Sequence, residues 1–163
     1  LGFGLLGNGL WISPHRVQGE VNEVAGELGV ADHIEIFRAE YRGYSSAAHL
    51  VGRCWNLPEI ERRYMDFLAR HGPAFERLSR GGERSLPEEA YVRRFWLVHE
   101  YRVFPLLDPY LPRELLPADW HGEAAAVLFD AYHDLLTAPA EQYVDSVLEV
   151  YEGAAQAVSA HGA

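Results

Sequence analysis

The sequence lacks lysine and long apolar runs, and it contains a single cysteine. Cys54 alone cannot form an internal disulfide, which favours a reducing compartment. No apolar run reaches the roughly 18 residues that a membrane-spanning helix needs. From these absences we expect a soluble, cytoplasmic protein with no membrane contact.

All 14 basic residues are arginine, and 24 acidic residues give a formal net charge of -10. A surface this acidic repels the phosphates of nucleic acids and of anionic lipids. The chain itself is therefore not expected to bind DNA. The 48% hydrophobic content predicts instead a globular fold with an ample core.

The first part of the chain mixes strands with one helix. Residues 1–14 are typical of a β-hairpin that turns at Asn8-Gly9. Apolar residues at helical spacing predict a helix from Val17 to Leu28, followed by a glycine. Alternating polarity then predicts a strand over 33–41. The order strand, strand, helix, strand matches the last four elements of a ferredoxin-like βαββαβ unit.

The rest of the chain has helical periodicity. Asn56 is positioned to cap a helix that breaks at Gly72-Pro73, and residues 79–86 are predicted to form a surface linker. The spacing of Ser85 and Glu88 indicates a capping box, from which a helix should run to about residue 104. Two closing helices are expected on either side of Pro139.

These patterns together predict an α+β fold that is mostly α. Residues 1–43 would form the second half of a ferredoxin-like domain, and residues 44–163 a helical domain.

Motifs for catalysis are incomplete. Residues 2–7 spell GxGxxG, but a dinucleotide site needs a strand before this motif and a helix after it. His99-Glu100 begins like the zinc motif HExxH, yet Val103 stands where the second histidine should be. We therefore expect no catalytic residue, no metal, no cofactor and no enzymatic activity.

The helix predicted around residue 96 is apolar on nearly every face, so we expect it to be buried on most sides. Trp96, His99 and Arg102 fall at intervals of three along it. One interpretation is structural, with the arginine paired to an acid such as Asp108. The other is an anion-recognising corner of a ligand pocket, to which Arg42 and other residues at the domain junction would contribute.

The segment Pro105–Gly122 contains the pattern DPxLPxELLPxDWxG, which resembles the C-terminal signature of the PaaX family of phenylacetate-degradation repressors. Similar family patterns occur at 2–14, 54–57 and 95–102, so the resemblance covers nearly the whole chain. Members have an N-terminal winged helix-turn-helix, a central Cas2-like domain and a helical C-terminal domain. By this resemblance the chain would begin inside the Cas2-like domain.

The resemblance implies the effector-sensing and dimerising portion of a bacterial transcriptional repressor. It implies a homodimer that binds operator DNA through the absent winged helix and responds to phenylacetyl-CoA or a related acyl-CoA. Arginine guanidinium groups can bind the phosphates of such a ligand, and aromatic side chains can contact its aryl or acyl group. The predicted ligand site lies between the sheet part and the helical part, and it consists of Arg42, Tyr44, Trp96, His99, Arg102 and Trp120.

Two other functions stay open from the sequence. The chain can be a dimerisation scaffold that binds no small ligand. An enzymatic function has less support, because the acidic metal ligand of Cas2-type nucleases lies on a first strand that this chain does not contain.

Overall fold

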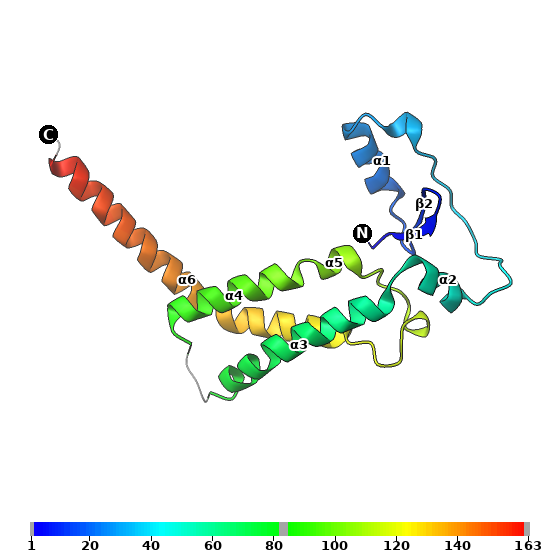
Figure 1. The fold of residues 1–163 in the computed structure, drawn as a ribbon. Helices are drawn as coiled ribbons and strands as arrows, with labels where there is room; N and C mark the ends of the chain where they lie inside the picture. Colours follow the sequence, from blue (N-terminus) through cyan, green and yellow to red (C-terminus); the bar gives the residue numbers. More distant parts are fainter. Residues whose placement is uncertain (1, 82–84, 162–163) are drawn as a thin grey trace. The chain divides into compact units, whose positions relative to one another are not determined.

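The computed structural model describes residues 2–81 and 85–161. The described chain is mostly helical with one two-stranded antiparallel sheet (Figure 1), which confirms the predicted α+β, mostly α class. Contacts divide the chain into two compact units. Unit 1 comprises Leu1–Glu61 and Val103–Trp120, and unit 2 comprises Arg62–Arg102 and His121–Ala163. These units group residues by contact, so the predicted domain boundary at 43/44 stays a prediction.

Unit 1 begins with the predicted hairpin. Strands β1 (Gly4–Gly7) and β2 (Leu10–Ile12) pair antiparallel. The turn between them uses positive φ angles of 50° at Asn8 and 78° at Gly9, as the Asn-Gly pair predicts. Helix α1 (Gln18–Glu27) follows and ends before a glycine with a φ of 67°, so both expectations are confirmed.

The third predicted strand is not formed. After a short 3-10 helix at Ala31–His33, residues 34–43 contain neither helix nor strand, and Ile34 and Ile36 are both exposed. A strand needs a neighbour that supplies backbone hydrogen bonds. Among the described residues only β1 and β2 pair, so the alternating pattern of this segment has no sheet to join.

The core of unit 1 is built around Trp55. This residue follows α2 (Ala47–Cys54), a helix absent from the sequence prediction, which begins where the Ser46 side chain accepts a hydrogen bond from the backbone N–H of His49. The Trp55 indole Nε1 donates to the backbone oxygen of Gly2 at 2.8 Å, and the ring lies directly against Gly4. The hairpin is thereby held to the end of α2.

The proline-rich segment also belongs to unit 1. Helix α5 (Phe104–Leu107) leads to Asp108, which is buried and accepts a hydrogen bond from the backbone N–H of Tyr110 at 2.7 Å. The ring Nε2 of His15 lies 2.8 Å from the backbone oxygen of Pro109. A 3-10 helix at Arg113–Leu115 completes the segment.

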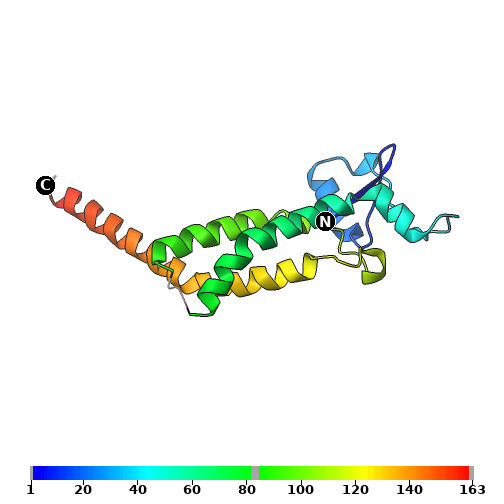
Figure 2. The same ribbon diagram turned by 60° about the horizontal axis from the view of Figure 1, so that its bottom comes forward.

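Unit 2 contains three helices that run side by side (Figures 1 and 2): α3 (Leu57–Ser79) from Arg62 onward, α4 (Pro87–Tyr101) and the first part of α6 (Gly122–His161). Asn56 accepts a hydrogen bond from the N–H of Glu59 and caps α3 as predicted. The buried apolar residues that these helices share are Tyr64, Phe67, Leu78, Ala90, Leu97, Ala125, Leu128, Tyr132, Leu136 and Ala140.

Two predicted helix breaks are wrong. Helix α3 continues through Pro73, and α6 continues through Pro139 as one helix of 40 residues. A proline inside a helix removes one backbone hydrogen bond. Buried residues on the turns beyond both prolines, Leu78 in α3 and Ala140 in α6, keep these turns packed.

The predicted ends of α4 also need correction. The residue before its first turn is Leu86, with no side-chain cap, and Pro87 occupies the first helical position. Ser85 lies one residue too early to cap, so the capping box does not form. The helix ends at Tyr101 rather than near residue 104. Part of the predicted linker, residues 82–84, lies outside the described residues.

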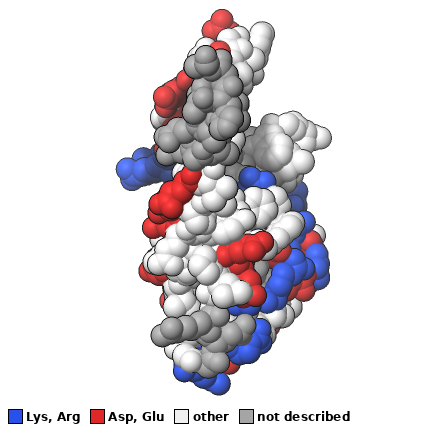
Figure 3. Space-filling model, turned by 90° about the vertical axis from the view of Figure 1, so that its left-hand side faces the viewer, with Lys and Arg blue, Asp and Glu red and all other residues white. Residues whose placement is uncertain are grey.

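The surface of unit 2 keeps a large apolar area in contact with solvent. Although Ala90 and Leu97 are fully buried, Phe95 and Trp96 on α4 are 53% and 50% exposed, so the expectation of a helix buried on most sides is wrong. The second part of α6 exposes Val144, Val147, Leu148 and Tyr151 at helical spacing. The space-filling view shows broad areas of uncharged surface among the acidic and basic side chains (Figure 3).

Candidate ligand cavity

Unit 2 contains a cavity of about 450 Å³, within the usual size range of small-molecule sites. All three long helices contribute to its wall. Residues from α3, α4 and α6 line it: Arg70, His71, Ala74, Val92, Arg93, Trp96, Glu100 and Tyr132. Aromatic and aliphatic surface therefore surrounds a small number of convergent polar groups, which is the usual composition of a ligand pocket.

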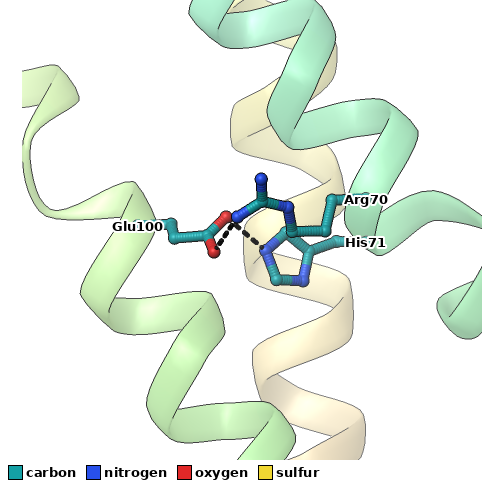
Figure 4. A network of polar contacts seen from close by, with 3 residues as sticks. All are labelled: Arg70, His71 and Glu100. Atoms are coloured by element: carbon teal, nitrogen blue, oxygen red, sulfur yellow. Dashed lines mark hydrogen bonds and ion pairs between the residues drawn. The ribbon is translucent and has the colours of Figure 1, made fainter.

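Glu100 links two helices at this cavity. Arg70 Nη1 donates to Glu100 Oε1 at 2.5 Å, and His71 Nε2 lies 3.1 Å from Glu100 Oε2. An ionised carboxylate only accepts hydrogen bonds, so the Nε2 of His71 carries the proton in this contact. Figure 4 shows Arg70 and His71 reaching from one helix to the carboxylate on the next, with a third helix behind them.

The environment of Glu100 favours its ionised form. Partial burial raises the pKa of Glu100, but hydrogen bonds from Arg70 and His71 and the positive charge of these groups outweigh it. The net result is a Glu100 pKa below its ordinary value of 4.5. The cavity therefore contains a carboxylate that stays negative at neutral pH.

This pKa shift predicts how stability changes with pH. A carboxyl whose pKa is lower in the folded state stabilises the fold above its unfolded pKa and loses that contribution as the pH falls through the folded value. We expect Glu100→Gln to lower the free energy of unfolding by about 1 kcal/mol near pH 7. The expected loss is no larger because Arg70 is largely exposed, and solvent weakens its ion pair with Glu100. Urea unfolding should show this difference from the wild type decreasing as the pH falls below 4.5, the ordinary pKa of the carboxyl, toward the lower folded value. A difference that is constant with pH contradicts the ionic role of Glu100.

Ring contacts continue from the cavity into the core. His71 lies on Phe67 with ring centroids 4.7 Å apart, and Phe67 contacts Tyr101 at 5.5 Å. Tyr101 stacks on Phe129 at 4.0 Å, and Phe129 stacks on His133 at 5.7 Å. These rings join the three helices, so the wall of the cavity is held by the same contacts that hold unit 2.

Three of the predicted site residues lie on unit 2. Trp96 lines the cavity. His99 contacts the Trp96 ring edge-to-face at 5.5 Å and stacks on Phe95 at 5.8 Å. Arg102 is exposed and follows the last residue of α4. The structure thus brings Trp96 and His99 together and places only Trp96 in the cavity wall.

The other three predicted site residues lie on unit 1. Arg42 is exposed and pairs with Glu40 at 2.9 Å. Tyr44 is fully exposed, and Trp120 is half-buried at the end of the proline-rich segment. Because the six predicted residues belong to two separate compact units, their convergence on one ligand site stays a prediction.

Sequence reasoning missed the polar residues of this cavity. The sequence analysis includes Glu100 in an incomplete zinc motif and in the family pattern at 95–102, without a role in a ligand site, and it does not single out Arg70 or His71. Their contacts with Glu100 span 30 and 29 residues of chain, which no local pattern reveals. A weak signal was present, since an arginine and a histidine adjoin the apolar stripe of α3 beside a predicted breaking proline.

Comparison with known families agrees with this architecture. Residues 55–146 match the PaaX-like protein C-terminal domain, and residues 1–51 match the PaaX protein central Cas2-like domain. The two matches together cover most of the chain, so the chain belongs to the PaaX family. The resemblance identified from the sequence is confirmed.

A curated member of this family shows extended similarity. The Transcriptional repressor PaaX of Escherichia coli (strain K12) is 37% identical over 130 residues, covering 78% of this chain and 41% of that protein. The chain thus spans about two fifths of the length of this relative. Among the described residues, no helix is long and apolar enough to cross a membrane, and no cluster of three or more His, Cys, Asp or Glu can hold a metal.

Proposed function

We propose that this chain is the effector-sensing and dimerising portion of a PaaX-type transcriptional repressor. The proposal includes a homodimer in the cytoplasm that has no enzymatic activity and contacts operator DNA through a winged helix outside this chain. Membership of the family supports it, as does the name of the Escherichia coli relative. The acidic net charge of -10 agrees with a part of the repressor that does not itself bind DNA.

The observation that carries the proposal is the cavity of unit 2. We propose that it receives the acyl group of phenylacetyl-CoA or a related acyl-CoA. Trp96, which is half exposed, offers a ring face to an aryl group, whereas Tyr132 is a buried part of the cavity wall. Val92 and Ala74 add apolar surface to this wall. A volume of about 450 Å³ suits the acyl end, whereas the nucleotide of CoA stays outside, where exposed guanidinium groups such as Arg102 bind phosphate.

Calorimetric titration with phenylacetyl-CoA tests this assignment. Ala74→Phe places a ring in the cavity and is expected to weaken binding at least about tenfold relative to the wild type. Ala69→Phe is the matched control, because Ala69 is exposed on the same helix and does not line the cavity. Absence of binding to the wild type, or equal binding by the wild type and Ala74→Phe, overturns the assignment.

A scaffold without a small ligand is the second candidate function. The observation in its favour is the exposed apolar stripe of α6, with Val147 and Leu148 at 48% and 53% exposure. Such a surface suits association between copies of the chain. Thermal unfolding separates the two functions, since a sensor is stabilised by phenylacetyl-CoA and a scaffold is not.

A further inference from the structure

Each basic side chain of the cavity wall already contacts a carboxylate. Arg70 and His71 both contact Glu100, at 2.5 and 3.1 Å. Arg93 Nη2 lies 3.7 Å from Glu89 on the same face of α4. Glu100, which lines the cavity, and Glu89, which lies outside the lining, thus offset part of the positive charge of the wall.

A ligand carboxylate gains little in such a cavity. Moving a carboxylate from water against the apolar part of this wall carries a desolvation penalty unless a counter-ion compensates it, and the exposure of Arg70 keeps this penalty below that of a closed pocket. Here the guanidinium of Arg70 is already engaged, and the ionised Glu100 repels a second negative charge. An uncharged aryl or acyl group avoids both costs while burying the same apolar surface against Trp96, which is 50% exposed.

We propose that Glu100 is a specificity-determining residue that makes this cavity select uncharged ligand groups over carboxylates. The inference rests on the proposed function in one respect, namely that the cavity is a ligand site. It adds that the ligand group bound in the cavity is uncharged and that Glu100 is the residue responsible for this selectivity. Glu100 acts by occupying Arg70 and His71 from inside the protein, in the place that a ligand carboxylate would take.

Two isosteric probes measure this selectivity. Phenylacetamide and phenylacetate have nearly the same size, but only the second is charged at neutral pH. Their dissociation constants are measured by NMR titration of the whole chain. We expect the wild type to prefer phenylacetamide by at least about tenfold. Equal affinities, a preference for phenylacetate or no binding of phenylacetamide overturns the proposal.

Glu100→Gln tests the residue itself. Glutamine keeps the size and an acceptor oxygen but removes the charge, which leaves Arg70 and His71 available to a ligand carboxylate. We expect the preference for phenylacetamide to fall at least about tenfold. Asp66→Asn is the matched control, because it removes the same charge from an exposed pair with Arg62, outside the cavity lining, and should leave the preference unchanged.

Arg70→Ala provides an independent second variant, because its side chain is 65% exposed and its removal spares the core. It leaves the negative charge of Glu100 less neutralised, so the preference for phenylacetamide should increase. A preference that is unchanged in both Glu100→Gln and Arg70→Ala overturns the role of Glu100.

The titration with phenylacetyl-CoA keeps this inference separate from the proposed function. Binding of the thioester with equal affinities for the two small probes overturns the role of Glu100 alone. Charge selectivity that depends on Glu100, without binding of the thioester, overturns the acyl-CoA assignment alone.

Discussion

Leu97→Ala is expected to lower the free energy of unfolding by about 2–5 kcal/mol. Leu97 is 0% exposed on α4, where that helix packs along α6. Truncation removes the transfer free energy of the buried methyl groups and leaves a void that three helices fill only in part. Urea unfolding followed by circular dichroism should show a lower midpoint at an unchanged slope.

Leu86→Ala is the control for this prediction. Leu86 precedes α4 in the same unit and is 65% exposed, so its truncation should change the free energy of unfolding by less than about 0.5 kcal/mol. Similar effects of the two substitutions would show that α4 does not pack as described.

Gly4→Ala should destabilise unit 1 through a single added methyl group. A Cβ at this position would lie 2.6 Å from Cε2 of Trp55 and 2.8 Å from the Cβ of Cys54. The indole cannot move away freely, because its Nε1 is hydrogen-bonded to Gly2. We expect a loss of about 1–3 kcal/mol in the free energy of unfolding, measured by urea denaturation.

Gly26→Ala provides the opposite expectation for the same chemical change. Gly26 lies in α1, and beyond its chain neighbours and the backbone of its own helix no heavy atom lies within 4 Å of the added Cβ. Alanine restricts the unfolded chain and favours the helix, so stability should rise by up to about 1 kcal/mol. A stabilising Gly4→Ala would contradict the close packing of β1 against Trp55.

The parts of the fold that the sequence predicts are those decided within a few residues. The hairpin follows from Asn8-Gly9, which accepts positive φ angles, and the start of α3 follows from Asn56, whose side chain caps the first turn. The family resemblance rests on similar local patterns. Such features need no knowledge of which distant segments meet.

The errors arise where packing overrides local preference. Pro73 and Pro139 are strong breaking signals, yet both lie inside continuous helices. The segment 34–43 has the alternation of a strand, but no described strand lies beside it. In each case the outcome depends on a neighbouring element that local periodicity does not specify.

Of the six residues predicted for a ligand site, only Trp96 lines the cavity, and the ligand site itself stays a prediction. Aromatic and cationic residues around Trp96 indicated a pocket, and Trp96 does line one. The remaining wall comes from α3 and α6, whose register against α4 is set by side-chain packing. The contacts of Glu100 on α4 with Arg70 and His71 on α3 depend on this register.

Pro73 has a mechanical consequence for this wall. It has no N–H to donate to the carbonyl of Ala69, so one backbone hydrogen bond of α3 is missing at this turn. A helix bends most easily where such a hydrogen bond is absent. Arg70 and His71 precede this joint and Ala74 follows it, so a bend of α3 at this turn would change the spacing between these residues of the cavity wall.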